Sequence, residues 1–543
     1  MATNCAIAAH RPKQRTLVRT TAAYVALALA SGAYLYPFVR VLTSIPDEGI
    51  FLSGAQAVVQ GAIPSHDFVD PAGPAAFFWL AAFFKLFGTN FVTARTVLLF
   101  TGVFTALVVF HLSRRMHQSG VFAAAFVVAT SIPVLVMNSP HYDSNLFALL
   151  SLAVFVSAQP AFRSRPRLFM AGVLAGVATC FIQQKGLYLA ASLVLALVLL
   201  DRKHCLAPIG ILSAGYSCIL AAEIVLYAGL KSLPDLIYAN FMWPLSTYES
   251  VNAASYGYTL RENWWPTWFS GLRPHFSLGL TLAQIAAFSI PWVLILVVPF
   301  LLPIVGYMWR PNAFRRDMLP YWLAGYALWA SELHRLDLGH LRNGTPVLII
   351  LFFALCERQQ GNIPRRLAFG IVACLTVYAT ANLLGAAAAH ATIHSRRGTL
   401  RASSSDAALD FLVAHTRPGE NVFVYPYRPI YYFLADLRNA TRFGFLVYGL
   451  NTPAQFREAI DDLEKKKVRY VLWDGLATQN LTALFPAYRP PAADQLIMEP
   501  YLETRYRQIG SEAGFRILER NNERLENRAT LPSGAVPMDA GGR

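Results

Sequence analysis

Long apolar stretches alternate with polar connections along the first 390 residues of the chain. In most of these stretches the apolar residues are continuous and do not keep to one face, which is typical of helices surrounded by lipid or by other helices. Their lengths lie near the roughly 20 residues that cross a bilayer. We predict eleven membrane-spanning helices, at 21–42, 92–112, 120–138, 145–160, 168–184, 186–200, 206–228, 278–307, 319–332, 343–357 and 366–389.

One polar stretch, 43–91, is too long and too acidic to be a simple connection. Asp47 and Glu48 stand together where the first apolar stretch ends, and Asp67 and Asp70 follow before a run of aromatic residues. A single acid at a membrane boundary is usually a solvated loop residue, whereas four acids in one loop indicate a functional site. We therefore expect the chemistry of the chain to involve this loop.

The pattern changes after about residue 395, where the apolar runs shorten and charges of both signs mix. Helical periodicity at Ser405–His415 and Pro453–Lys466 alternates with short apolar runs at Asn421–Tyr425, Val468–Trp473 and Phe515–Glu519. This alternation predicts a small α/β domain.

The chain thus divides into four predicted regions. Residues 1–20 form an N-terminal segment, 21–390 the membrane domain, and 395–520 the α/β domain. The tail 521–543 is polar and without periodicity, so we expect it to be disordered.

Composition supports a membrane protein. The chain is 55% hydrophobic and only 14% charged, with a mean hydropathy of +0.40, which is too apolar for an ordinary soluble protein. None of the six cysteines has CxxC spacing, and none lies beyond Cys374. A disulfide-stapled exported domain and a zinc site of the usual spacing are therefore not expected.

The net charge of +15 is mostly a signal of topology. Lys and Arg gather in alternate short connections, as at Arg114 and Arg115 or at Arg202 and Lys203, while the other connections are longer and more acidic. Basic short loops mark the cytoplasmic face, so we predict a cytoplasmic N-terminus and a retained first span. Loop 43–91 and the α/β domain then lie outside, and nucleic acid is not an expected partner.

A resemblance to a known superfamily extends this interpretation. The motif PDEG, the stretch GAIPSHDFVDPAGPAAFFWLAAFFKLFG and Arg95 in the next span resemble the GT-C superfamily, and more narrowly bacterial relatives of the protein O-mannosyltransferases and aminoarabinose–lipid A transferases. The resemblance is strongest over residues 20–200. It implies a polytopic glycosyltransferase of the bacterial inner membrane, with its α/β domain in the periplasm or outside the cell. Its partners would be a polyprenyl-phosphate-linked hexose or pentose and a lipid, glycan or protein acceptor.

The resemblance also implies roles for the acidic pair. Asp47 matches the position of the catalytic carboxylate, which would take the proton of the acceptor in a single displacement that inverts the sugar. General-base help of this kind contributes roughly a 10²- to 10⁴-fold rate increase. Glu48 is assigned to the catalytic site as a support of the loop or acceptor. The alternative for Asp47 is a helix cap or a solvated acid.

Three further residues are candidates for orienting the acceptor. Asp70 and Asp143 match acids of the relatives, and His141 stands two residues before Asp143 in the sequence NSPHYDSN. Asp70 precedes Pro71, so a turn residue is the alternative. A divalent cation, Mg²⁺ or Mn²⁺, is one option for this site, with Asp47 and Asp70 as ligands; the other option is no cofactor.

The leaving phosphate needs positive charge on the outer side. Lys185 lies at the tip of an apolar hairpin, where an unpaired Lys costs about 2.5–3.5 kcal/mol, so it should have a partner. Lys185, Arg335, His340 and Arg342 are the predicted donor-phosphate residues. The alternatives are a snorkelling lysine and solvated loop residues. The Trp- and Tyr-rich loop 229–277, with Tyr248, either lies at the membrane interface or lines a groove for a lipid or sugar.

Two other classes of function remain open. A transporter would show internal repeats and ionisable residues near the centres of spans, and Glu223 is the single candidate for the latter. A membrane scaffold that binds through the α/β domain would leave the acids of 43–91 without a role. The sequence does not identify the sugar or the acceptor.

Overall fold

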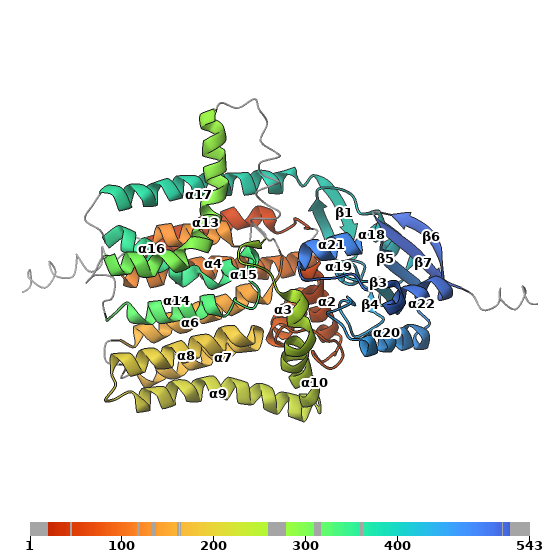
Figure 1. Cartoon of the computed structure of the whole chain (residues 1–543), viewed down its shortest axis with the longest axis horizontal. Coiled ribbons are helices and arrows are strands. Elements are labelled where there is room, and N and C mark those ends of the chain that lie inside the picture. Colours follow the sequence, from red (N-terminus) through yellow and green to blue (C-terminus); the bar gives the residue numbers. More distant parts are fainter. Residues whose placement is uncertain are drawn as a thin grey trace, which may run out of the picture.

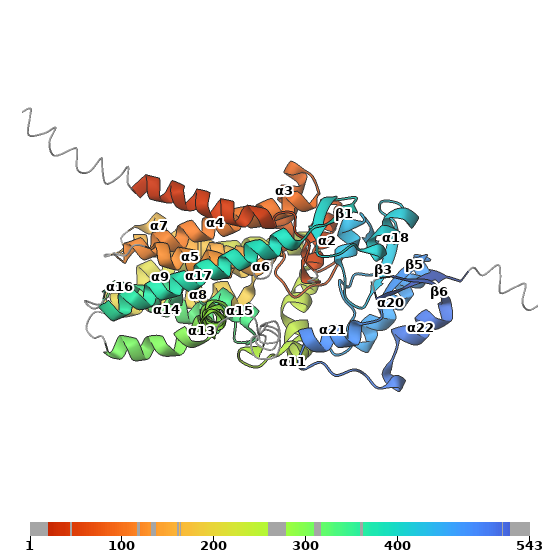
Figure 2. The same ribbon diagram turned by 90° about the horizontal axis from the view of Figure 1, so that it is seen from above.

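The computed structural model describes residues 20–43, 46–116, 120–131, 137–159, 162, 164–258, 278–308, 316–358, 362–512 and 514–521. The predicted N-terminal segment, apart from residue 20, and the predicted tail beyond residue 521 lie outside the described residues. Figures 1 and 2 show a helical bundle at one end of the molecule and a mixed α/β domain at the other.

Each of the eleven predicted spans overlaps a helix of the bundle. These are Thr20–Phe38, α4 (Phe91–Arg115), α5 (Val121–Thr130), α6 (Pro140–Ser157), α7 (Arg165–Phe181), α8 (Gln183–Leu200), α9 (Leu206–Gly229), α13 (Leu278–Met308), α14 (Leu319–Ala330), α16 (Pro346–Arg358) and α17 (Asn362–Ala388).

Fewer helices have the full length and hydropathy of a membrane span. Within the described ranges six helices meet both conditions, and a seventh is added if α15 (Leu338–Gly344) and α16, bent by 64°, form one broken span. The chain is therefore a multi-pass membrane protein, and eleven crossings stay a prediction. The helices α5 and α14 have only 10 and 12 residues.

The predicted loop 43–91 consists largely of two helices, α2 (Asp47–Val59) and α3 (Ala75–Phe87), joined by the segment 60–74. The rings of Phe68 and Phe77 meet edge to face at 4.9 Å, and Phe51 stacks on Phe77 at 5.7 Å. Gly54 lies so close to Phe77 that a Cβ would approach the ring to 2.5 Å. The two helices are thus packed together and hold the acidic residues on a rigid support.

Residues 391–520 form the C-terminal domain. An antiparallel hairpin of β1 (Ala391–Ser395) and β2 (Gly398–Ala402) precedes a five-stranded sheet with the order β4-β3-β5-β7-β6. Strand β3 pairs in parallel with β4 and β5, whereas β7 is antiparallel to β5 and β6. The strands are β3 (Asn421–Tyr425), β4 (Arg438–Asn439), β5 (Tyr470–Asp474), β6 (Tyr506–Glu512) and β7 (Phe515–Arg520).

Helices of the C-terminal domain pack around this sheet and toward the bundle. They are α18 (Ala407–His415), α19 (Ile430–Leu434), α20 (Pro453–Lys465), α21 (Ala477–Leu484) and α22 (Met498–Arg505). The start of α20 follows from its sequence, because Thr452 and Gln455 form a capping box.

The α2–α3 pair lies between the bundle and the C-terminal domain and shares one apolar core with that domain. Phe84 of α3 stacks on Phe433 of α19 at 5.6 Å, and both rings are buried. Burial of such a side chain contributes about 1.5–3 kcal/mol. Backbone bridges add to this contact, because Val41 pairs with Arg401 and Val69 with Phe443. The seam between the two parts is therefore a packed interface.

Candidate active site

Asp47 is the first residue of α2 and lies at the seam. Its side chain is half-buried, and Oδ1 accepts a hydrogen bond from the hydroxyl of Tyr427 in the C-terminal domain. A carboxylate in the first turn of a helix also interacts favourably with the helix dipole. None of the described residues donates a hydrogen bond to Oδ2. One carboxylate oxygen is thus held in place and the other is free to accept a proton.

Glu48 faces the opposite way, into the bundle. Its side chain is 1% exposed and forms an ion pair with Arg95 of α4, with Oε2 2.6 Å from Nη2. Its other oxygen accepts hydrogen bonds from the backbone and side-chain nitrogens of Asn138, at 2.9 and 3.0 Å. This geometry suits a residue that fastens the start of α2 to the bundle.

Asp70 is buried in the segment that joins α2 to α3. Its Oδ1 accepts a hydrogen bond from the backbone of Ala72 at 2.9 Å, which is the turn geometry expected before Pro71. Burial, with a smaller contribution from the negative charge of Asp47, raises the pKa of Asp70 to about 7. The two carboxyl groups therefore interact through the electrostatic field. Asp67 accepts from the backbone of Ile63 at 2.7 Å and is exposed.

The segment around Asp70 is fixed to the end of α7. The backbone nitrogen of Gly73 donates to the carbonyl of Phe181 at 3.1 Å, and Gln183 donates to the carbonyl of Pro71 at 3.2 Å. A Cβ at position 73 would lie 2.0 Å from the carbonyl oxygen of Cys180, so only glycine fits. The glycine of the PAGP motif thus permits a close contact between backbones.

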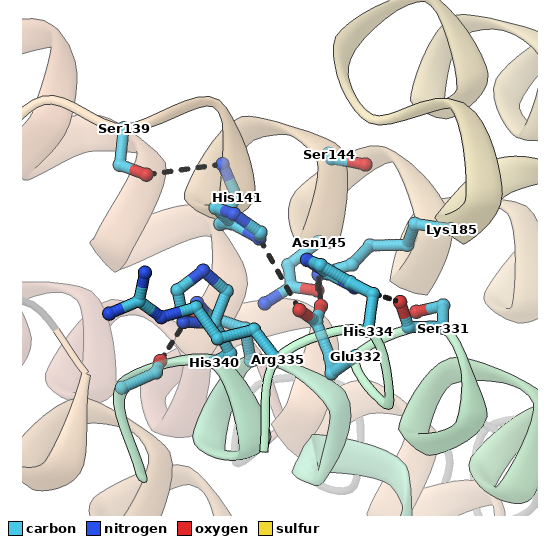
Figure 3. A network of polar contacts seen from close by, with 12 residues as sticks. Ser139, His141, Ser144, Asn145, Lys185, Ser331, Glu332, His334, Arg335 and His340 are labelled. Atoms are coloured by element: carbon cyan, nitrogen blue, oxygen red, sulfur yellow. Dashed lines mark hydrogen bonds and ion pairs between the residues drawn. The ribbon is translucent and has the colours of Figure 1, made fainter. Parts of the chain in front are cut away.

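Lys185 has the partner that its position requires. The ammonium lies 2.6 Å from Oε1 of Glu332 and donates to Oδ1 of Asn145 at 2.7 Å, and the side chain is 0% exposed. His141 faces the other oxygen of Glu332 at 3.6 Å (Figure 3). The positive charge of Lys185 is thus matched by the buried carboxylate of Glu332.

Arg335 and His340 share a second acid, Asp337. Arg335 Nε lies 2.5 Å from Oδ2 of Asp337, and His340 Nδ1 lies 2.9 Å from Oδ1. Arg335 also donates to the carbonyl of Leu484 at 2.5 Å and lies 5.3 Å from the centre of the Phe485 ring. This arginine therefore joins the bundle to the C-terminal domain.

Arg342 and Asp143 lie within the bundle. Arg342 donates to the Tyr142 hydroxyl at 2.5 Å and to the carbonyl of Ser131 at 2.9 Å, and it lines a cavity of about 30 Å³. Asp143 accepts from the hydroxyl of Thr101 at 2.8 Å. Neither side chain contacts Asp47 or Asp70 directly.

The predicted site residues thus fall into two neighbouring groups, with three residues apart from them: Glu48, Asp143 and Arg342. Asp47, Asp70 and Arg335 interact electrostatically around Tyr248 and Tyr427 at the seam. Lys185, His141 and His340 form the second group, with Glu332 and His334 between them; the His340 ring lies 5.2 Å from that of His141. Asp337 connects the groups because it binds both Arg335 and His340.

Sequence reasoning did not identify Tyr427 as part of the site. Tyr427 lies in the motif YPYRPIYY, 380 residues beyond Asp47, and nothing in its spacing points to the acidic loop. Tyr248 belongs to the aromatic loop that we predicted to line a groove or to lie at the interface. Its place beside the acids follows from packing and is not encoded in a local pattern.

A metal ion does not fit the carboxylates well. Across the described ranges no group of three or more His, Cys, Asp or Glu side chains is arranged to hold a metal. Oδ1 of Asp47 already accepts a hydrogen bond from Tyr427, and Oδ1 of Asp70 accepts a hydrogen bond from the backbone nitrogen of Ala72. A hard cation needs more oxygen ligands than this pair leaves available.

Comparison with known proteins agrees with the fold. Residues 70–227 match the family model described as dolichyl-phosphate-mannose-protein mannosyltransferase. The structure of ArnT from Cupriavidus metallidurans bound to undecaprenyl phosphate has 13% sequence identity and a TM-score of 0.51, and the match covers 93% of this chain and 98% of ArnT. No curated protein matches in sequence.

A second similar structure is the oligosaccharyltransferase of Archaeoglobus fulgidus in the apo form. It has 12% identity and a TM-score of 0.50, with 85% of this chain and 71% of that chain covered. At these identities the likeness concerns the fold. The predicted resemblance to the GT-C superfamily is confirmed as a likeness of fold to ArnT and to this oligosaccharyltransferase.

Proposed function

We propose that this protein is a membrane glycosyltransferase that moves a sugar from a polyprenyl-phosphate-linked donor to an acceptor outside the cytoplasm. The observation that carries the proposal is the position of Asp47, whose carboxylate begins α2 at the seam with one oxygen held by Tyr427 and the other unengaged. The family match over 70–227 and the likeness to ArnT support the reaction class. The structure of ArnT holds undecaprenyl phosphate, which supports a polyprenyl carrier here.

The proposed reaction is a single displacement with inversion. Oδ2 of Asp47 takes the proton of the acceptor hydroxyl or amine while the acceptor atom forms a bond to the anomeric carbon. The bond between that carbon and the phosphate oxygen breaks, and its electron pair leaves with the polyprenyl phosphate. Glu48 keeps α2 in place through Arg95. In this proposal Asp70, Asp143 and His141 act on the acceptor side, directly or through neighbouring groups.

Positive charge must stabilise the leaving phosphate, and Arg335 is the best placed of the four predicted cations. Arg335 interacts electrostatically with Asp47 at the seam. Its ion-pair partner, Asp337, also pairs with His340, so the negative charge of Asp337 is divided between two cationic side chains. Lys185 would have to exchange Glu332 for phosphate, and Arg342 would have to leave Tyr142. Lys185 and Arg342 therefore rank behind Arg335 as donor contacts.

The location follows from the same proposal. The basic short connections favour a cytoplasmic N-terminus in a bacterial inner membrane, with the C-terminal domain in the periplasm or outside the cell. Whether the sugar is a hexose or a pentose depends on contacts with the donor. A broad panel of donors is therefore part of the test.

The test is sugar transfer by the purified full-length protein in lipid bilayers. Undecaprenyl-phosphate sugars are supplied with a lipid extract, and the release of undecaprenyl phosphate is measured. We expect the wild type to turn over and Asp47→Asn to lose about 10²- to 10⁴-fold in rate. Asp67→Asn is the matched control, because Asp67 is an exposed acid of the same stretch that only accepts a turn hydrogen bond.

The outcomes separate the alternatives. Normal turnover by Asp47→Asn would remove the proposed base. Lack of turnover by the wild type with every donor, together with flux of solute across the bilayer, would replace the glycosyltransferase by a transporter. Loss of wild-type turnover on chelation would show that a metal takes part after all.

A further inference from the structure

The seam between α2 and the C-terminal domain is closed most tightly at the first turn of α2. Gly49 lies against the start of α19, and a Cβ at that position would come within 2.0 Å of the backbone nitrogen of Ile430. The segment that carries Tyr427 leads directly into α19. The backbone around Tyr427 is therefore fixed relative to Asp47.

Aromatic packing fixes the Tyr427 side chain as well. The ring lies 5.4 Å from Phe445 and 6.4 Å from Phe485, and the residue is 8% exposed. Phe485 in turn lies beneath the guanidinium of Arg335. The hydroxyl has few orientations available, and in the one that it takes it donates a hydrogen bond to Oδ1 of Asp47.

This hydroxyl remains a donor at all ordinary pH values. Burial, followed by the negative charge of Asp47, raises the pKa of Tyr427 well above its usual range. A neutral phenol that donates to a carboxylate stabilises the ionised form of the carboxylate. It also leaves Oδ2 as the basic oxygen for the acceptor.

We propose that Tyr427 is a positioning residue for Asp47, so that the C-terminal domain supplies a part of the active site and not only a lid or a binding module. This inference rests on the proposed function. Tyr427 itself exchanges no proton with the substrates: its proton stays on the phenol oxygen, donated in a hydrogen bond to Oδ1, while Oδ2 gains the proton of the acceptor. The carboxylate is thereby held in one orientation.

The test compares Tyr427→Phe with Tyr425→Phe in the full-length protein in lipid bilayers. Tyr425 is a matched control because it lies two residues away, is also buried, and donates to a different carboxylate, that of Glu499, at 2.5 Å. A hydrogen bond to a charged group is worth about 1.5–3 kcal/mol. We therefore expect kcat of Tyr427→Phe to fall roughly 10- to 100-fold with little change in KM for the donor.

The pH dependence separates positioning from a merely structural role. Without the donated hydrogen bond the carboxylate is protonated more easily, so the acid limb of the pH–kcat profile moves to higher pH in Tyr427→Phe. The profile of Tyr425→Phe keeps the wild-type position. An unchanged kcat and profile in Tyr427→Phe, or equal losses in both variants, would overturn the inference.

A second measurement does not depend on turnover. Carbodiimides modify protonated carboxyl groups, so the labelling of Asp47, followed by mass spectrometry across a pH series, reports its protonation. If the wild type transfers no sugar, the proposed function fails, but the labelling still tests whether Tyr427 acts on Asp47. A labelling midpoint at higher pH in Tyr427→Phe than in the wild type supports the role of Tyr427, and equal midpoints overturn that role.

Discussion

Adjacent carboxylates at the start of α2 have opposite surroundings, and this contrast separates their roles. Asp47 lies at the seam with one free oxygen, whereas Glu48 is enclosed by Arg95 and Asn138. The sequence motif indicated that both acids matter. It could not distinguish them, because which side of the helix faces the bundle is decided by packing between distant segments.

Lys185 is the residue for which a structural and a chemical role can be separated most directly. Lys185→Met leaves Glu332 buried without its partner, and breaking such a pair costs about 3–5 kcal/mol. Adding Glu332→Leu removes the uncompensated charge, so we expect Lys185→Met to lower the melting temperature in detergent and the double variant to regain most of it. We expect turnover to stay low in the double variant.

Recovery of turnover along with stability would contradict the proposed contact between Lys185 and the donor phosphate. Lys231→Met serves as the control for loss of a lysine, because Lys231 is exposed. That substitution should leave both the melting temperature and the turnover near the wild-type values.

At the scale of elements, the stretch 43–91 differs most from its prediction. We predicted a loop, and the structure contains α2 and α3. The residues of α2 mix apolar, small and polar types without a clear helical stripe, so periodicity gave no signal there. Its helical form depends on burial between the bundle and the C-terminal domain, which no local pattern reports.

The contact between α2 and α19 has a direct test in Gly49→Ala. The added Cβ would meet backbone at 2.0 Å, so α2 must move away from α19 and separate Asp47 from Tyr427. We expect turnover to fall at least as much as in Tyr427→Phe, because the same contact is lost. Sugar transfer and melting temperature are measured side by side.

Gly210→Ala is the matched control, since Gly210 lies in the helix α9 and a Cβ there has no neighbour within 4 Å. An alanine in a helix interior is favoured over glycine by about 1 kcal/mol, so this variant should be as stable as the wild type or more so. Full activity of Gly49→Ala would mean that the seam tolerates movement.

At the scale of the whole molecule, the sequence predicted the positions of the bundle helices well. Continuous apolar runs leave few alternatives, and each predicted span meets a helix. In the C-terminal domain the predicted strand Asn421–Tyr425 has the same bounds as β3, and the helix Pro453–Lys466 differs from α20 by one residue. The arrangement of these parts was not predictable, because Tyr427, Arg335 and Asp47 meet only through tertiary packing.

The predicted topology gives a test for the whole molecule. We expect a cysteine at Ser404, an exposed residue of the C-terminal domain, to react with an impermeant maleimide in intact cells. A cysteine at His204, exposed in the connection after α8, should react only after the inner membrane is opened. The wild type, with its own cysteines, is the blank, and the reverse pattern would invert the topology.

The pairing of Asp47 with a residue 380 positions later also concerns the synthesis of the protein. The ribosome makes the carboxylate before the bundle helices α4 to α17, whereas its hydroxyl partner follows all of them. A nascent or truncated chain would then carry the proposed base without the group that we propose to orient it. Under this proposal, activity would arise only after the C-terminal domain has folded onto α2 and α3.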